Sequence, residues 1–384
     1  MRRHATAVST RWILRYLRVD DSWGASVARD AARALASTVS TERAAKNARF
    51  NIVGFCSPPP TPFASWRGFA VGSHRAEHVV RANRGGRGGG ARAQAIELNR
   101  EIIASRSAGE ILAIVEDRGE SFNGVNVATA VNKLCKVARA RDNLRRDPRY
   151  KHLLELVQKN ANEMNPQGIA NVLNALSKLD AASAAVSREG WSHFSVAAER
   201  HAVAMNAQEV STTLNAYAEM RKRRPQASAA VTETGWHSLA AATARTAPTI
   251  TNQAIALTVD AAKKLNAFAS AIDDEGWEIL AAAVARMALD FNAQQTVLAL
   301  SAVGWKQELA RSLHRQGGFD ALIGSIERNI DAIRRGYPPD FAKETRKTLD
   351  AIRLIYEHED EAYGDQRLER LRTELQTKPG NRHK

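Results

Sequence analysis

The 384-residue sequence lacks the features of several protein classes. Its two cysteines, Cys56 and Cys135, form no CxxC pair and have no clustered histidines nearby, which excludes a disulfide framework and argues against a zinc site. No apolar run approaches the about 18 residues that a membrane-spanning helix needs. Aromatic residues make up only 6% of the chain and strand-favouring runs are scarce, whereas alanine is abundant. We therefore expect an all-α protein without a membrane partner.

Motifs of catalysis are missing as well. The chain has no phosphate loop GxxxxGK[ST], no dinucleotide-binding GxGxxG, no HExxH and no GxSxG. The acidic stretch EHEDEAYGD from Glu357 lacks the alternating ligands of a calcium loop. We expect no enzyme activity, no catalytic or metal-binding residue, no cofactor and no small-molecule substrate.

The net charge of +14 is unevenly distributed. Residues 1–100 hold 17 lysines and arginines against 6 acidic residues, a net +11, whereas residues 122–305 hold 20 against 16, a net +4. Most of the basicity therefore belongs to the N-terminal region, and the high isoelectric point is no direct evidence of phosphate binding elsewhere.

Residues 1–40 resemble an organelle transit segment. If Arg11 to Val19 is helical, Arg11, Arg15 and Arg18 share one face opposite an apolar one, and no acidic residue precedes Asp20. We expect targeting to a mitochondrion or chloroplast. The alternative is a basic surface helix at the chain terminus.

Residues 41–96 contain a proline-rich stretch, CSPPPTPFASW, and a glycine- and arginine-rich one, RANRGGRGGGARAQ. Neither can bury enough apolar surface to offset the entropy of ordering, so we expect a disordered linker. The alternative for Arg84 to Gly90 is a short arginine-glycine RNA-binding tract.

Internal repetition is the strongest signal in the chain. The segment MNPQGIANVLNALSKL aligns without gaps under FNGVNVATAVNKLCKV, and three further copies follow. Start-to-start spacings are 42, 41, 45 and 41 residues, and the five units begin at Phe122, Met164, Met205, Ile250 and Phe291. This pattern predicts an α-solenoid of two-helix repeats with a period of about 41–45 residues over residues 97–305.

A second motif recurs in phase with the first. A Gly-Trp pair ends at Trp191, Trp236 and Trp277, and Tyr150 takes the matching position in the first unit. The extra four residues of the third unit lie around 221–226, which predicts a surface turn there. We expect the tryptophans to pack between neighbouring units.

Capping residues predict where the helices begin. Each first helix follows a polar residue with capping ability, and each second helix follows another. The first-helix caps are Asn123, Asn165, Asn206, Thr251 and Asn292, and the second-helix caps are Ser187, Thr232 and Asp273. Base reading by the asparagines and base stacking by the tryptophans are the alternatives to caps and core.

A polar face is expected on each first helix, opposite the apolar face. It holds Thr129, Asn132 and Lys136 in the first unit, Asn171, Asn174 and Lys178 in the second, Thr212, Asn215 and Glu219 in the third, and Leu257, Asp260 and Lys264 in the fourth. Short hydrogen-bonding side chains that change from unit to unit suit a modular reader of single-stranded RNA. An ordinary solvated helix face is the alternative.

Basic residues are concentrated between Lys133 and Lys151. This segment has eight lysines and arginines against two acidic residues, a net +6: Lys133, Lys136, Arg139, Arg141, Arg145, Arg146, Arg149 and Lys151. We expect contacts with phosphates to concentrate at this N-terminal end of the array.

Four segments of the repeats are NPQGIANVLNALSKL, MNAQEVSTTLNAYAEM, GWSHFSVAAERHA and ARTAP. They resemble the octotricopeptide-repeat proteins and the related helical arrays of RAP-domain and FAST-kinase-like proteins. The resemblance covers about residues 109–305 and includes no RAP domain. It implies an α-solenoid that binds organellar RNA in transcript maturation, stability or translation. NALSKL also resembles, more weakly, the repeats of SKWP-type bacterial effectors.

The array is expected to end near Gly304 and Trp305, because glycine disfavours a helix interior. We expect residues 306–358 to form capping helices outside the period and residues 359–384 to form a charged tail. For the array, we predict single-stranded RNA as the partner. The alternative is a protein-binding scaffold, either an adaptor or a bacterial effector.

Overall fold

The computed structural model describes residues 89–139, 142–179, 186–335 and 365–376, together with Thr345 and Leu349. All regular structure in these ranges is helical, which confirms the predicted all-α helical-repeat array. The predicted transit segment 1–40 and residues 41–88 of the predicted linker lie outside the described residues.

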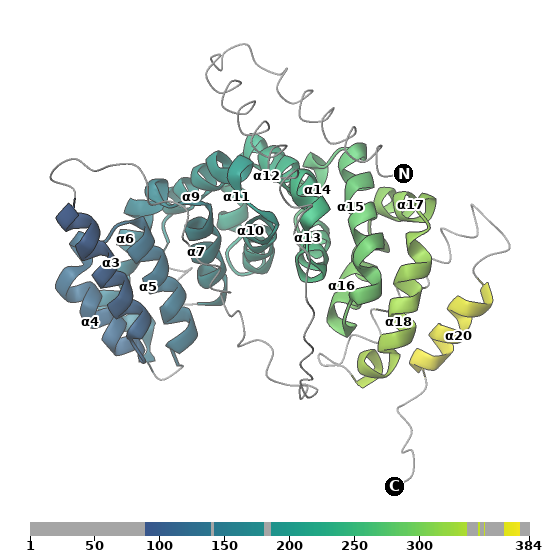
Figure 1. Ribbon diagram of the computed structural model, residues 1–384, viewed down its shortest axis with the longest axis horizontal. Helices are drawn as coiled ribbons and strands as arrows, with labels where there is room; N and C mark the ends of the chain where they lie inside the picture. Colours follow the sequence, from purple (N-terminus) through teal and green to yellow (C-terminus); the bar gives the residue numbers. More distant parts are fainter. Residues whose placement is uncertain are drawn as a thin grey trace, which may run out of the picture. The chain divides into compact units, whose positions relative to one another are not determined.

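One layer of the array consists of the first helices, each packed against its predecessor and its successor (Figure 1). These helices are α3 (Gly89–Ala104), α5 (Gly124–Val137), α7 (Pro166–Lys178), α10 (Ala207–Met220), α13 (Asn252–Lys264) and α16 (Ala293–Val303).

The second helices form the other layer. They are α4 (Ala108–Arg118), α6 (Pro148–Asn160), α9 (Arg188–His201), α12 (Glu233–Thr246), α15 (Asp274–Met287) and α18 (Gly318–Arg335). A short 3-10 turn leads from each second helix to the next first helix: η2 (Gly119–Ser121), η5 (Ala161–Glu163), η6 (Ala202–Ala204), η7 (Ala247–Thr249) and η8 (Ala288–Asp290). Buried alanine, leucine and valine side chains fill the space between the layers.

The connection from first to second helix adds a short element that sequence patterning did not predict. It is η4 (Leu144–Arg146) in unit 1, α11 (Pro225–Ala229) in unit 3, α14 (Asn266–Ala271) in unit 4 and α17 (Gln307–Arg315) in unit 5. α11, α14 and α17 each pack against the second helix of the preceding unit. They therefore tie consecutive units together.

The predicted caps are confirmed. The side chain of Asn165 accepts a hydrogen bond from the backbone N–H of Gly168 at 2.7 Å, and Asp273 accepts one from Gly276 at 2.8 Å. The same geometry is present at the other caps, Asn123, Asn206, Thr251, Asn292, Ser187 and Thr232. Capping therefore explains why these residues recur.

The tryptophans are core residues, as predicted. Trp191, Trp236 and Trp277 are 0%, 4% and 2% exposed. Trp236 lies 5.7 Å from Tyr217 of its own unit and 6.2 Å from Phe268 of the next, measured between ring centroids. It therefore packs between units, and burial removes these rings from base stacking.

Two glycines that precede the core aromatic residue, Gly190 and Gly318, lie where second helices approach one another. A Cβ atom at Gly190 would be 2.1 Å from the side-chain oxygen of Gln158 on the preceding second helix. At Gly318 it would be 2.7 Å from Ala285. At Gly276 the nearest atoms belong instead to Ile272 and Asp273 of its own unit, so the close helix contact is not made in every unit.

Arginines near the ends of the second helices join each unit to the one before it, a feature that the sequence interpretation missed. Arg245 donates to the carbonyls of Ala202 and Met205 at 3.0 and 2.6 Å, and Arg286 donates to Ala247 at 2.6 Å. Arg200 and Arg328 make corresponding contacts, with Asn162 and with Ala288 and Leu289. Each arginine follows the aromatic residue of its own unit by nine positions, a signal that is visible in the sequence.

Two predicted boundaries need correction at the N-terminal side and in the tail. Helix α3 begins at Gly89, so the last residues of the predicted linker 41–96 are helical. Within the predicted charged tail 359–384, α20 (Asp365–Gln376) contacts α18, and Arg367 and Arg370 pair with Glu327 at 2.7 and 2.8 Å.

The predicted end of the array near residue 305 is also wrong. Helix α16 does stop at Val303, but α17 and α18 complete a fifth unit instead of forming separate caps. Gly318 and Phe319 occupy the Gly-Trp position, and Arg328 follows nine residues later. The described array therefore extends to Arg335. Of the remaining predicted capping residues up to 358, only Thr345 and Leu349 are described, and both are buried and helical.

Candidate nucleic-acid interface

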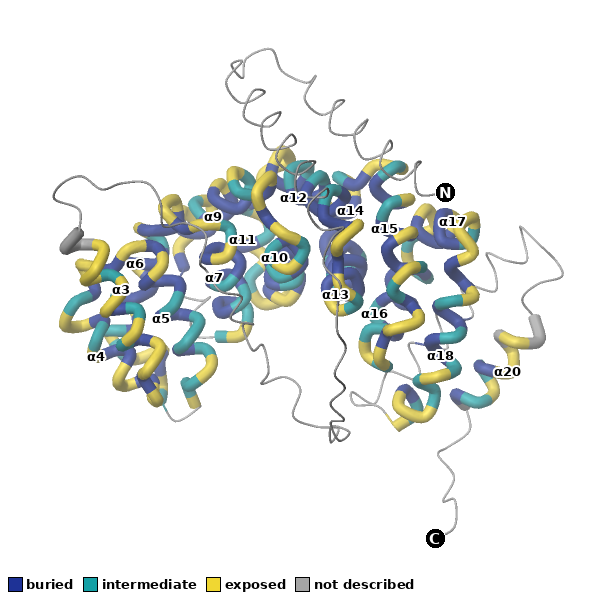
Figure 2. The backbone as a smooth tube through the Cα atoms, in the orientation of Figure 1, coloured by how far each residue is buried: buried dark blue, intermediate teal, exposed yellow. Residues whose placement is uncertain are grey.

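Each first helix leaves one face uncovered by its neighbours. The side chains on this face lie 3, 7, 10 and 14 positions after the start of each unit, which is the i, i+4, i+7 spacing of a single helix side. We name this surface the first-helix face; it consists of Val125, Thr129, Asn132 and Lys136; Gln167, Asn171, Asn174 and Lys178; Gln208, Thr212, Asn215 and Glu219; Gln253, Leu257, Asp260 and Lys264; and Gln294, Leu298, Ser301 and Trp305. All but Asp260 and Ser301 are exposed or partly exposed, and Figure 2 shows such segments alternating with buried ones along α10 and α13.

The face continues from one unit to the next. The ammonium of Lys264 on α13 lies 2.9 Å from the carboxylate of Glu219 on α10. Lys263 donates a hydrogen bond to Ser301 on α16. Burial raises the pKa of the Cys135 thiol on α5, although the nearby charge of Lys178 on α7 acts in the opposite direction. Side chains of successive first helices therefore meet along one surface.

Three asparagines occupy the same position in successive units. Asn132, Asn174 and Asn215 are half-buried, and within the described part of the chain their carboxamides make no hydrogen bond. Structural asparagines behave differently: the amide of Asn126 donates to the carbonyl of Ala95 at 2.8 Å. The amides on the first-helix face are therefore available to a ligand, as are Thr129, Asn171 and Thr212 beside them.

The predicted basic residues divide into two groups. Lys136, Arg139, Arg145 and Arg146 are exposed near the end of α5 and in η4. Lys178 is also exposed, at the end of α7, although it has an interaction partner within the chain. These side chains can reach a phosphate backbone passing this edge.

The second group is already engaged within the protein. Arg149 pairs with Asp147 at 2.8 Å and with Glu116 at 3.7 Å, and its hydrogen bond holds the pKa of Asp147 below the usual value. Lys133 donates to the carbonyl of Ile103 at 2.6 Å. Both side chains stabilise the array, so their predicted phosphate contacts would have to displace these partners.

Lys264 belongs to this group too. It lies 2.8 Å from the buried carboxylate of Asp260 and 2.9 Å from Glu219. Burial lowers its pKa, but the two carboxylates outweigh burial and the net pKa is raised. The ammonium is charged but neutralised locally, which makes it a poor phosphate ligand.

Two parts of the face were not predicted from the sequence. Gln167, Gln208, Gln253 and Gln294 are exposed or partly exposed at one position in four successive units, one helical turn before the predicted residues. Extending the same spacing by four positions toward the helix start would have found them.

Helix α3 carries the same pattern in front of unit 1. Arg92, Ile96, Asn99 and Ile103 follow the i, i+4, i+7 spacing and are exposed or partly exposed. The contacts of Asn126 with Ala95 and of Lys133 with Ile103 place this part of α3 beside α5. The first-helix face therefore begins on α3.

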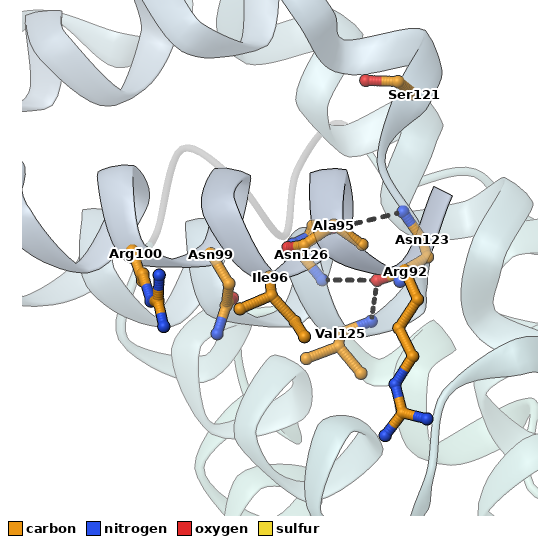
Figure 3. Close-up of a pocket in the computed structure, with 9 residues that line it drawn as sticks. All are labelled: Arg92, Ala95, Ile96, Asn99, Arg100, Ser121, Asn123, Val125 and Asn126. Atoms are coloured by element: carbon orange, nitrogen blue, oxygen red, sulfur yellow. Dashed lines mark hydrogen bonds between the residues drawn. The ribbon is translucent and has the colours of Figure 1, made fainter. Parts of the chain in front are cut away.

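A pocket of about 530 Å³ opens on this end of the face (Figure 3). Its lining comes from α3 and from the start of α5: Arg92, Ala95, Ile96, Asn99, Arg100, Ser121, Asn123, Val125 and Asn126. Figure 3 shows the side chains of Arg92, Ile96, Asn99 and Val125 directed to the same side. The pocket combines apolar side chains with two guanidinium groups.

The opposite end of the face is more apolar. Leu257 and Leu298 take the position of Thr129 and Thr212, and Trp305 takes that of Lys136. Trp305 is 41% exposed, unlike the buried core tryptophans.

The described ranges contain no group of three or more metal-ligating side chains placed to hold a metal ion. In the same ranges no helix has the length and apolar character to cross a membrane.

Comparison with known proteins gives one short match. Residues 151–173, which cover most of α6 and the first half of α7, match the model of a family described as "Protein of unknown function (DUF1601)". No curated protein matches the chain.

Proposed function

We propose that the array binds single-stranded RNA along the first-helix face. The observation that carries the proposal is the row of half-buried asparagine amides without internal hydrogen bonds, Asn132, Asn174 and Asn215. The carboxamide atoms of these residues are not buried, so a ligand with matching donors and acceptors can replace the water on them. The edge of a nucleobase offers the donors and acceptors that a carboxamide needs.

The spacing of the face suits a strand read one base per unit. Packed helices lie about 8–10 Å apart, and helical-repeat proteins use such spacing to read one base per repeat. The neighbouring position holds Thr129, Asn171 and Thr212, so the side chains beside each amide differ between units. Such variation on a constant scaffold can produce sequence preference.

Phosphate contacts are assigned to the exposed cations near α5 and η4. Arg145 and Arg146 project from the connection of unit 1, and Lys136 and Arg139 lie beside the end of α5. Each neutralised phosphate of a single strand contributes about 0.7 to the slope of log affinity against log salt. Binding should therefore be salt-dependent mainly through this end.

The experiment is a salt titration of the affinity for a single-stranded oligonucleotide. The double variant R145A/R146A should weaken binding and reduce the slope by about 1.4. The matched control is R221A/K222A, which removes two exposed charges from the corresponding connection of unit 3 and should have the smaller effect. No RNA affinity in the unmodified chain, or equal effects of the two pairs, would contradict this assignment.

A protein-binding scaffold is the second candidate, favoured by the apolar end of the face. Leu257, Leu298 and Trp305 would suit an apolar peptide better than a phosphate backbone. Crosslinking in cells followed by recovery of bound RNA separates the two candidates. RNA above background supports the first, and its absence together with a recovered protein partner supports the second.

The proposed setting is organellar transcript maturation, stability or translation, in a mitochondrion or chloroplast. It is supported by the resemblance of the repeats and by the Arg11, Arg15 and Arg18 pattern. A fluorescent protein fused to residues 1–40 should enter the organelle, and changing these arginines to glutamate should prevent import. A diffuse signal from the unchanged fusion would refute targeting.

A further inference from the structure

We propose that the pocket between α3 and α5 holds one nucleotide, with its base on the apolar wall and its phosphate on Arg92 and Arg100. The inference deepens the proposed function by adding a terminal nucleotide subsite to the RNA path. The same pocket can be tested with a free nucleotide, so its test does not depend on the longer strand.

The apolar wall is the first observation. Val125 is 51% exposed and Ile96 is 46% exposed, and both line the pocket. In the other four units the position of Val125 is glutamine, so the apolar side chain occurs only beside the pocket. Exposed apolar side chains gathered in a hollow indicate a binding surface for an apolar or aromatic group.

The polar groups are the second observation. The side-chain oxygen of Asn99 is buried without a hydrogen-bond partner within the described residues. The nearby asparagines are satisfied, because Asn126 donates to Ala95 and Asn123 caps α5. Asn99 is therefore the amide in this pocket that still lacks a partner for its oxygen. Because that oxygen is itself buried, a base in the pocket contacts the Asn99 amide from its accessible side.

The arginines add the anion-binding element. Arg92 is exposed at the pocket wall, and Arg100 pairs with Glu97 at 3.3 Å, with the two side chains 73% and 61% exposed. Such exposed pairs are weak and exchange easily. A phosphate can bind both guanidinium groups, whereas the carboxylate of Glu97 pairs with only Arg100 of the two arginines.

The size of the pocket agrees with this ligand. A volume of about 530 Å³ lies within the range of small-molecule sites. An apolar wall, an amide and two guanidiniums together match a base joined to a phosphate. An aliphatic peptide segment would leave the amide and both cations unused.

Calorimetry of the full chain with AMP, CMP, UMP and inorganic phosphate tests the pocket directly. AMP, CMP and UMP should each bind better than inorganic phosphate, because the base adds contact with the apolar wall. The double variant R92A/R100A should weaken nucleotide binding by about tenfold or more. R188A is the matched control and should stay within about twofold, because Arg188 is exposed at the start of α9.

The variant V125Q tests the apolar wall without removing charge. It introduces the residue that four other units carry at this position, so the fold tolerates it. Weaker nucleotide binding with an unchanged melting temperature is expected. Unchanged binding in both V125Q and R92A/R100A would overturn the pocket assignment, as would phosphate binding as tightly as AMP.

An RNA arm separates failure of the pocket from failure of the proposed function. Photocrosslinking of an oligonucleotide carrying a reactive terminal base should label the peptide containing residues 92–100. RNA binding without this label, and unaffected by R92A/R100A, would overturn the pocket and leave the proposed function. Nucleotide binding in the pocket without affinity for longer RNA would overturn the proposed function instead. Failure of both arms overturns both.

Discussion

The first-helix face changes character between unit 3 and unit 4, while the scaffold beneath it stays the same. Units 1 to 3 present Asn132, Asn174 and Asn215, whereas units 4 and 5 place Asp260 and Ser301 at that position. The neighbouring Thr129, Asn171 and Thr212 give way to two leucines, Leu257 and Leu298. The caps, the buried aromatic residues and the joining arginines continue across this change. The scaffold and the face are therefore separately variable, and binding preference can be changed without changing the fold.

A substitution in the scaffold where the two regions join should cause the largest loss in the free energy of unfolding. Trp236 packs on Tyr217 of unit 3 and on Phe268 of unit 4. The substitution W236A should lower the free energy of unfolding by about 3–5 kcal/mol, through lost burial and the cavity left behind. Chemical denaturation followed by circular dichroism measures the change. The control W305A removes a ring that is 41% exposed and should cost clearly less than W236A; equal effects of the two would contradict the assigned roles.

The joining arginines test whether the stability of the scaffold is independent of the change in the first-helix face. R245M removes two hydrogen bonds to backbone carbonyls inside the polar region, and R286M removes one at the junction of units 3 and 4. Each should cost about 1–3 kcal/mol, with R245M the more costly because it removes two hydrogen bonds instead of one. Thermal melting measures both against R188M. A negligible effect of R245M would show that these contacts do not stabilise the array.

Exchanging residues of the face should alter binding but leave stability nearly unchanged. The triple variant N132A/N174A/N215A should weaken RNA binding by at least about tenfold, because each amide that pairs with a base edge contributes about 1–3 kcal/mol. The companion L257N/L298N gives the apolar region the polar character of the first three units and should not weaken RNA binding. Affinities measured at one salt concentration decide the matter. A larger loss from the leucine exchange than from the asparagine triple would favour the scaffold function.

The smallest loss in the free energy of unfolding is expected at the ion pair that joins unit 3 to unit 4. E219Q removes one partner of Lys264, whose side chain is 35% exposed, and should cost about 0.2–1 kcal/mol. Because the pKa of Lys264 is raised, its charge contributes fully below the ordinary lysine pKa of about 10.4 and is lost as pH rises through the folded value. The cost should therefore be constant from pH 6 to 9 in denaturation experiments. A cost that falls steadily across this range would contradict the assignment.

Much of the fold could be predicted because its signals are local. Asn165 before Pro166 fixes the start of a helix, and a recurring Trp on an apolar helix marks the core. The second helix of the fifth unit was missed because Phe319 replaces the tryptophan. Helix α3 was missed because its first residues are glycines and arginines, whose composition resembles a linker.

The candidate site could be predicted only in part, because helical spacing gives the face but not the partners of its side chains. The engagement of Lys264 by Asp260 is an i, i+4 pair that the sequence displays. The contact of Lys133 with Ile103 joins residues 30 positions apart and depends on helix packing. The pocket beside Val125 likewise exists only once α3 is placed against α5.

The joining arginines have a consequence for how the chain is made. Arg200, Arg245, Arg286 and Arg328 all reach back to carbonyls of the preceding unit, never forward. A ribosome releases the chain from its N-terminus, so each arginine emerges after its acceptors have already left the exit tunnel. Each unit can thus be fastened as soon as it appears, which favours vectorial assembly during translation over docking of finished units afterwards.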